Sequence, residues 1–485
     1  MSGPSSEVHR RPGAEHPRVL LSVDRLDEAP GLAAWVLMLV RGTPEVRWLV
    51  QSVRTPGSPS PLPLRLPPNA RSLRPLVPRP VRRLPSVAWP AVTRPTLPED
   101  LARGLLGQGH EPFAVVDALV RCRLSPALAA REFRSAQGRA AVAEVVRAAI
   151  EEEPSIPSGP DGAEVTRVVE ALWAIACTAA APIPAVDMVH AVSVGPAAIR
   201  GIVQRALHGT PLVLTEHDLP VDDGGLHPMV GGHSATARFL RRRLAHGLAR
   251  AAYATADLVA PTTVTLAELQ VAQGASPDRV RVIRGGVAGA PPPRPPETAG
   301  VVVSLGRMHP DGGVHTALRV AAEVVRRFPA VSFLHVGERP RDQRPYRDAC
   351  TALHRELGLG DRFRFLEAGC DRRRVVGMGT VVLLAGELAA STGLLLEVMA
   401  EERPVVAPRL HAGPELLGGC GLLAAPGDVG GLATAVCTLL RSPALAQELG
   451  RRARARAVGQ YGEWQSLQAY RAIFSALSRR FGEAA

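Results

Sequence analysis

Apolar residues recur along the chain in two patterns, short uninterrupted runs of strand length and longer stretches with a helical period. Near the N-terminus, residues 18–23 (RVLLSV) form one short run, residues 32–40 follow a helical pattern, and residues 46–53 form a second run. Pro30 and Gly31 predict a turn before the helix. A strand, a helix and a second strand in this order are typical of a Rossmann-like α/β domain with a parallel sheet.

The same alternation returns further along the chain. Additional strands are predicted at 187–192, 212–215, 301–305, 381–384 and 404–407. Because a single hydrophobic core stops growing near ~250–300 residues, a chain of 485 residues is expected to form two such domains. The sequence therefore predicts an α/β fold with two Rossmann-like lobes.

Two segments of the first lobe break the alternation. Residues 55–98 are crowded with proline and arginine, and proline, which has no N–H, predicts an irregular insertion there. Residues 100–181 carry apolar side chains at helical spacing and predict a helical subdomain. The predicted divisions are a disordered tail (1–16), an N-terminal lobe (17–290), a linker (291–299), a C-terminal lobe (300–462) and a last helix that packs back on the first lobe (463–485).

The net charge of +12 comes from arginine spread along the whole length, and the chain has no lysine. No basic run is interleaved with aromatic residues that could stack on bases, so a nucleic-acid partner is not expected. The six cysteines lie far apart without metal-ligand spacing, which favours free thiols in a reducing cytoplasm. No apolar run reaches the ~18 residues of a membrane span, so we expect a cytoplasmic protein, with peripheral attachment to the inner face of the membrane left open.

The stretch 381–428 carries the candidate chemistry of the second lobe. It contains an apolar run, a small-residue loop with Thr392 and Gly393, a short helix with Glu397, a second strand and a turn with Glu415. In an open parallel sheet, ligands bind at the carboxyl ends of the strands, where this loop lies. The sequence therefore predicts a binding site at this edge.

In the first lobe, Glu216 and His217 follow the predicted strand 212–215. Side chains just beyond a strand end can act as a general base or orient a substrate. A loop histidine of this kind is also often a satisfied polar contact, and both interpretations stay open.

Both regions resemble one family. The motifs LLLEVMAEERPVVA, Gly413-Pro414-Glu415 and GLLAAPGD keep the order and spacing of the donor-sugar site of the family-four retaining glycosyltransferases, which have the GT-B fold. The segments VHAVS and GTPLVLTEH look like the acceptor lobe of the Pel exopolysaccharide type within that family, which also carries a helical insertion. The resemblance covers most of residues 17–480 and implies transfer of a hexose, with retention, from a nucleotide-diphosphate sugar.

The resemblance also implies roles for single residues. Glu216 and His217 would be catalytic, and the donor would be bound by Gly31, Gly306, Arg307, Thr392, Gly393, Glu397 and Glu415. Arg307 would stabilise the charge that develops on the leaving diphosphate. For Glu397 the other interpretation is that it only stabilises the start of a helix, where acidic residues are favoured. No metal and no cofactor are implied, a UDP-sugar is the favoured donor, and the acceptor is a polysaccharide, a lipid-linked sugar at the membrane surface or a small molecule.

The chain departs from the family pattern in four places: the first turn, where only Gly31 of two glycines remains, the acceptor loop after His217, one acidic position and one basic position. The first acidic residue, eight positions before Glu397, is Ala389, and the diphosphate lysine falls on Gly312 or Gly313. His309, or the N–H groups of a helix that begins near Gly313, are the candidates to replace that lysine. The alternative function is therefore a protein that kept the fold, lost turnover and partners an intact paralogue in polysaccharide assembly.

Overall fold

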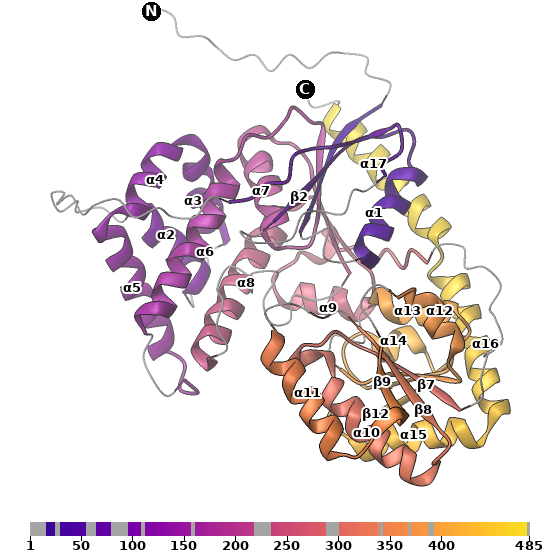
Figure 1. The fold of residues 1–485 in the computed structure, drawn as a ribbon. Coiled ribbons are helices and arrows are strands. Elements are labelled where there is room, and N and C mark those ends of the chain that lie inside the picture. Colours follow the sequence, from indigo (N-terminus) through magenta and orange to yellow (C-terminus); the bar gives the residue numbers. More distant parts are fainter. Residues whose placement is uncertain are drawn as a thin grey trace, which may run out of the picture.

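The structure is a computed structural model of the chain. It describes residues 16–24, 30–54, 65–78, 96–107, 112–156, 161–217, 234–287, 300–337, 339, 343–366, 370–386 and 392–482. These residues form two lobes, each built on a parallel six-stranded sheet, as the sequence predicts (Figure 1).

The first sheet has the strand order β3-β2-β1-β4-β5-β6. Its strands are β1 (Arg18–Asp24), β2 (Arg47–Val53), β3 (Ala70–Ser72), β4 (Met188–Val192), β5 (Leu212–Glu216) and β6 (Leu258–Pro261). The helices that connect them are α1 (Pro30–Gly42), α7 (Pro196–His208) and α8 (Ala235–Thr255), and α9 (Val264–Ala272) follows β6. Because the central strands are buried on both faces, they read as continuous apolar runs rather than alternating ones.

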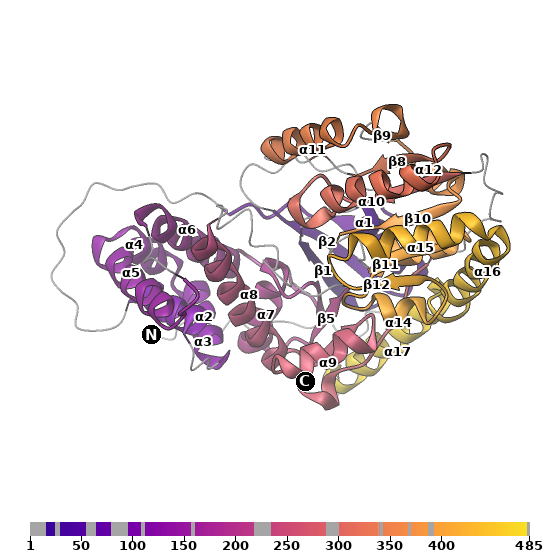
Figure 2. The same ribbon diagram turned by 90° about the horizontal axis from the view of Figure 1, so that it is seen from below.

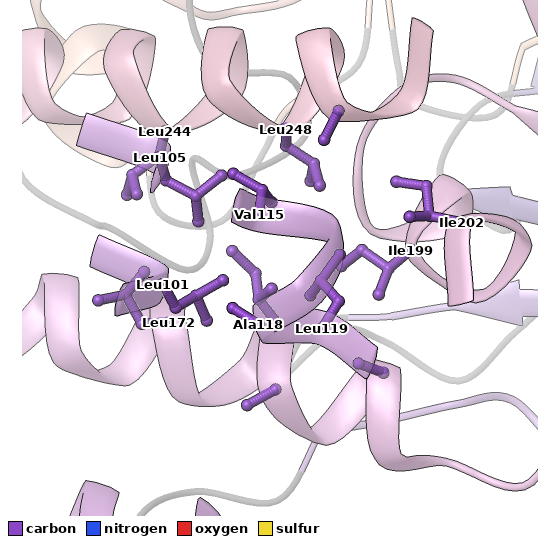
Figure 3. Close-up of a cluster of buried hydrophobic side chains, with 14 of the residues drawn as sticks. Leu101, Leu105, Val115, Ala118, Leu119, Leu172, Ile199, Ile202, Leu244 and Leu248 are labelled. Atoms are coloured by element: carbon purple, nitrogen blue, oxygen red, sulfur yellow. The ribbon is translucent and has the colours of Figure 1, made fainter. Parts of the chain in front are cut away.

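The predicted helical subdomain is present and stands on one side of the first sheet (Figures 1 and 2). Its helices are α2 (Leu97–Leu106), α3 (Pro112–Leu124), α4 (Pro126–Arg134), α5 (Ala136–Glu151) and α6 (Gly162–Ala180). Figure 3 shows Val115 and Leu119 of α3 packed among leucine and isoleucine side chains of α2, α6, α7 and α8. The insertion therefore shares one continuous core with the sheet.

The second sheet has the order β12-β11-β10-β7-β8-β9. Its strands are β7 (Val301–Leu305), β8 (Ser332–Val336), β9 (Phe363–Phe365), β10 (Val381–Leu384), β11 (Val405–Pro408) and β12 (Leu422–Ala424). Its helices are α10 (Val314–Arg327), α11 (Arg344–Glu356), α12 (Arg372–Met378), α13 (Thr392–Ala400), α14 (Gly413–Leu417), α15 (Val429–Arg441) and α16 (Pro443–Gln460). Read along the chain, both sheets have the same doubly wound connectivity, with the direction of winding reversing between β1 and β4 and between β7 and β10.

The last helix, α17 (Glu463–Gly482), returns to the first lobe beside α1 (Figure 1). Its Tyr470, Ile473 and Phe474 are buried in the core formed by α1 and one face of the first sheet. The hydroxyl of Tyr470 lies 2.8 Å from Thr215 Oγ1 of β5. The chain thus crosses between the lobes a second time, and Ser466 Oγ donates to Arg284 O beside the first crossing.

Two expectations about the first lobe are wrong. Residues 70–72, inside the proline-rich stretch, pair in parallel with β2 as an edge strand, because the prolines flank the three paired residues instead of interrupting them. Pro30 and Gly31 lie in the first turn of α1 and do not form a separate turn. Proline is well tolerated there because the first N–H groups of a helix have no intrahelical partner.

The predicted linker 291–299 and residues 1–15 of the predicted tail lie outside the described residues. No single helix in the described part of the chain is long and apolar enough to span a membrane; α15 and α16 reach that composition only as a pair bent by 105°.

Candidate functional site

The carboxyl edges of the two sheets face each other. Helices that follow strand ends in one lobe contact helices that follow strand ends in the other, as α1 does with α13. In doubly wound sheets a ligand binds at the carboxyl edge, where the strand order reverses. In the second lobe that point is between β7 and β10, which pair with Leu384 opposite Leu305.

Glycines pack backbone against backbone at this point. A side chain at Gly313 would collide with Gly386 beyond β10, and one at Gly306 would collide with the carbonyl of Gly312. Gly313 also has a φ of +72°, which side chains disfavour. The loop after β7 and the loop after β10 therefore touch directly, which brings the predicted site segments together.

This packing leaves no space for a side chain at either position where the resemblance implies a lysine. A Cβ at Gly312 would overlap the carbonyl oxygen of Arg307, and Gly313 is closed off by Gly386. Helix α10 begins at Val314, directly after Gly313, and has no side-chain cap. The helix start that the sequence predicted is therefore at the switch point.

Arg307 is paired within its own loop. Its Nη2 donates to Asp311 Oδ2 at 2.9 Å and its Nε to Oδ1 at 3.3 Å, while His309 Nδ1 lies 2.5 Å from Asp311 Oδ1. Burial alone would raise the pKa of Asp311, but the hydrogen bonds from His309 and Arg307 outweigh it and lower that pKa to about 2. Asp311, which sequence reasoning missed, thus neutralises the cation assigned to the diphosphate.

Glu397 lies inside α13, so the interpretation that it caps a following helix is wrong. Arg372, at the start of α12, grips its carboxylate with two hydrogen bonds, Nε to Oε1 at 3.1 Å and Nη2 to Oε2 at 2.6 Å. The two residues are 25 positions apart in different elements, and no local spacing in the sequence indicates the pair. Glu397 remains 29% exposed.

Thr392 and Gly393 form the first turn of α13, with Thr392 buried and Gly393 exposed. Ala389, where the family has its first acidic residue, lies outside the described residues. The seven residues between β10 and α13 begin with Ala385 and Gly386, so α13 starts at the same carboxyl edge as the loop of Arg307.

Glu415 connects the lobes. Its carboxylate accepts hydrogen bonds from Val264 N at 2.9 Å, Thr265 N at 2.8 Å and Thr265 Oγ1 at 2.9 Å, all in the first turn of α9. A carboxylate at a helix N-terminus satisfies N–H groups that have no intrahelical partner. The carboxylate of Glu415, which the sequence assigned to donor binding, is therefore hydrogen-bonded to the first lobe. Figure 2 shows α14 and α9 side by side.

Glu216 differs from expectation. It is the last residue of β5 rather than a loop residue, it is 2% exposed, and its Oε2 accepts from Tyr253 Oη and Gln270 Nε2, both at 2.6 Å. Burial raises the pKa of Glu216 to about 7, and the two hydrogen bonds oppose that rise. A carboxyl enclosed between α8 and α9 in this way is a core group.

His217 follows β5 and packs edge-on against Trp35 of α1, with ring centroids 4.7 Å apart. Burial lowers the pKa of His217 to about 4, so its ring is neutral at physiological pH. Its Nε2 is buried without a hydrogen-bond partner among the described residues, which omit 218–233 immediately after it. Both catalytic candidates lie at the carboxyl end of β5; the Glu216 side chain is enclosed by α8 and α9, whereas the His217 ring packs against α1. Gly31, in the first turn of α1, follows β1 on the same edge.

Sequence reasoning missed the switch point of the first lobe. Ser193, directly after β4, has a φ of +88°, which is rare for a residue with a side chain. Its hydroxyl donates to Asp24 Oδ2 at 2.8 Å, and Asp24 Oδ1 accepts from Ala197 N in the first turn of α7. These bonds hold the strained backbone beside β1. Among the described residues, no three His, Cys, Asp or Glu side chains cluster as metal ligands would.

Sequence families match each lobe separately. A family described as Glycosyltransferase Family 4 matches residues 96–288, and one described as glycosyl transferases group 1 matches residues 299–442. Together with the two facing doubly wound sheets, these matches support a GT-B glycosyltransferase architecture. The chain has the GT-B fold.

Curated relatives of this GT-B chain match over part of their length. The lipopolysaccharide core biosynthesis glycosyltransferase LpsE of Rhizobium meliloti is 29% identical over 178 residues, 36% of this chain and 49% of that protein. The N-acetyl-alpha-D-glucosaminyl L-malate synthase of Bacillus anthracis is 26% identical over 182 residues, 37% of this chain and 46% of that protein. The chain therefore spans about half the length of these relatives.

Solved structures show the same GT-B fold. Sucrose-phosphate synthase of Thermosynechococcus elongatus has a TM-score of 0.59 at 19% identity, with 95% of this chain and 100% of that one covered. HepE of Anabaena, solved in complex with UDP-glucose, also has a TM-score of 0.59, at 16% identity and the same coverage. At such identities the likeness establishes the fold alone.

Proposed function

We propose that the protein transfers a hexose, with retention, from a nucleoside-diphosphate sugar to a polysaccharide, lipid-linked or small-molecule acceptor. The observation that carries the proposal is the switch point between β7 and β10, where the loop of Arg307 packs against the segment that leads to α13 and Glu397. This is the place where a doubly wound sheet binds a nucleotide. HepE, which shares the fold, was solved with UDP-glucose, so UDP is the favoured nucleotide.

In this proposal the leaving diphosphate gains charge as the glycosidic bond breaks, and fixed donors stabilise it. Arg307 exchanges Asp311 for a phosphate oxygen, and the uncapped N–H groups of α10 supply the contacts that a lysine makes elsewhere in the family. Glu397 accepts hydrogen bonds from donor hydroxyls, and neutral His217 orients the acceptor. Glu216 acts only by supporting α9 through Gln270.

A second candidate is a glycosyltransferase-like binding protein without turnover, which partners an intact paralogue in polysaccharide assembly. The observation that favours it is the closed pairing of Arg307, Asp311 and His309, together with the lack of space for a cation at Gly312 or Gly313. A cation already neutralised by a carboxylate binds phosphate less strongly.

Nucleotide binding tests the proposal first. UDP, GDP and ADP are titrated to millimolar concentration while the melting temperature is measured, because a ligand that binds the native state raises it by mass action. We expect one nucleotide to raise it by several degrees, Arg307→Ala to abolish the rise, and Asp311→Asn to strengthen binding by freeing the guanidinium. Arg326→Ala is the matched control, since Arg326 lies on the far turn of α10 and is exposed.

Turnover then separates the two candidates. The nucleotide that binds is supplied as its hexose conjugate, and release of free nucleoside diphosphate is followed with and without added acceptor sugars. Binding without release supports the binding protein. The absence of any melting shift with all three nucleotides would contradict the enzyme and would favour the protein that only partners a paralogue.

A further inference from the structure

Two arginine–glutamate pairs lie side by side and join α12 to α13 and to the residue that directly follows it. Arg372 pairs with Glu397, and Arg373 pairs with Glu401 one turn further along. Both pairs are formed by neighbouring residues of one short helix, but their surroundings differ. The Glu401 side chain is only 10% exposed, whereas that of Glu397 is 29% exposed. Only the first pair therefore presents its carboxylate to a ligand.

The geometry of the Arg372–Glu397 pair leaves the carboxylate able to accept further hydrogen bonds. Each oxygen of Glu397 receives one N–H of the Arg372 fork, at 3.1 and 2.6 Å. The two oxygens of a carboxylate offer about four acceptor sites, so the contacts within the described part of the chain leave one on each oxygen. A bidentate guanidinium also fixes the plane of the carboxylate, which a flexible side chain on a helix does not do by itself.

The pair lies next to the switch point of the second lobe. α13 starts a few residues after β10, and α12 packs against both α13 and β7. Two free, coplanar lone pairs held there match two hydroxyl groups on neighbouring carbons. That chemistry occurs in a nucleoside diphosphate as the ribose 2′- and 3′-hydroxyls, and in a nucleotide sugar also on the hexose.

We propose that Arg372 is a positioning residue, which holds the Glu397 carboxylate oriented so that its remaining lone pairs accept a vicinal pair of donor hydroxyls. The inference rests on the proposed function, because it needs a nucleotide in the cleft. It assigns a role to a residue that the sequence motifs do not contain, and it makes donor recognition depend on the α12–α13 contact.

Calorimetric titration tests the inference on the intact chain. The wild type, Arg372→Gln, Arg372→Lys and Arg373→Gln are each titrated with UDP, 2′-deoxy-UDP, UDP-glucose and UDP-2-deoxyglucose. If another nucleotide binds better, its own 2′-deoxy form replaces that of UDP. The melting temperature of each variant without ligand shows that it is folded.

The four ligands form two pairs that differ by one hydroxyl: UDP with 2′-deoxy-UDP, and UDP-glucose with UDP-2-deoxyglucose. In one of these pairs the wild type is expected to bind the hydroxylated ligand roughly 10- to 100-fold more tightly, the usual effect of a hydrogen bond to a charged group. Arg372→Gln should reduce this preference to less than about threefold, Arg372→Lys should restore part of it, and Arg373→Gln should keep it. Loss of preference in the UDP pair assigns the ribose, and loss in the UDP-glucose pair assigns the hexose.

Three results would overturn the inference while leaving nucleotide binding in place. Arg372→Gln could keep the wild-type preference, Arg373→Gln could lose it equally, or the wild type could bind without any preference. A wild type that binds no nucleotide refutes both the inference and the proposed function, and this outcome is recognised by the absence of heat with every ligand.

Discussion

Glu216 is a buried carboxyl whose ionisation opposes folding, and this gives a prediction with a defined sign. Burial raises its pKa from 4.5 to about 7, although Tyr253 and Gln270 donate hydrogen bonds to it. Between these two pH values the native chain holds a proton that the unfolded chain has lost. Stability therefore decreases as pH rises through this window, by about 1.4 kcal/mol per pH unit and about 3 kcal/mol in total.

Three buried histidines change the pH dependence of stability in the opposite direction. Burial lowers the pKa of His190 to about 3 and those of His217 and His335 to about 4, so the chain loses stability as pH falls below about 6.5. The net profile of the wild type mixes both effects. A difference between two chains that share the histidines isolates Glu216.

Glu216→Gln is that second chain, because its amide does not titrate. The free energy of unfolding is measured by urea titration for both chains from pH 4.5 to 8. The amide brings N–H donors into a site that supplies donors, so the variant is expected to be less stable at low pH. We expect the stability difference, wild type minus variant, to shrink by about 3 kcal/mol between pH 4.5 and 7.

Tyr253→Phe is the control for the direction in which the pKa of Glu216 is shifted. The hydrogen bond from Tyr253 lowers the pKa of Glu216, so its loss should move the pH window upward. If the wild type and Glu216→Gln have parallel profiles from pH 4.5 to 8, the carboxyl is not held protonated, and the assignment of Glu216 to the core is refuted.

Three further predictions concern packing and the lobe contact. Glu415→Ala removes three hydrogen bonds between the lobes and should broaden the interlobe distance distribution measured by double electron–electron resonance. Thr265→Val removes only one of these hydrogen bonds and should have a smaller effect. Identical distributions for the wild type and Glu415→Ala would contradict the contact. Gly313→Ala should lower the free energy of unfolding by more than about 2 kcal/mol, because its φ is +72° and its Cβ meets Gly386; an unchanged urea midpoint would show that the loop adapts. Tyr470→Phe should cost about 1 kcal/mol, since it deletes the hydroxyl bonded to Thr215 of β5, and no change in that free energy would mean the bond adds nothing.

Much of the fold could be predicted from local pattern. The runs 18–23, 212–215 and 301–305 became central strands because side chains buried on both faces of a parallel sheet are mostly apolar; the buried polar exceptions in these runs are Ser22, Thr215 and Ser304. The helical period over 100–181 became five helices for a similar reason, since one face of each must be buried. Composition misled at residues 70–72, where proline density hid a short edge strand.

For the candidate site, the sequence predicted the positions of single residues but not their partners. Motif spacing placed Arg307 and Glu397 near strand ends, which the order of the strands makes adjacent. Their partners could not be predicted in the same way. Asp311 neutralises Arg307 from within one loop, and Arg372 reaches Glu397 from another helix.

By itself, then, the sequence determined most of the strands and helices and that two Rossmann-like lobes form, because burial imposes a period that a chain displays locally. The tertiary structure alone decided which charges are paired and which are available. Glu415 meets the start of α9 from 150 residues away, and Glu216 is enclosed by two helices that follow it in the chain. Hydrogen bonds and ion pairs act over a few ångströms, and whether two distant residues come that close depends on the packing of whole elements.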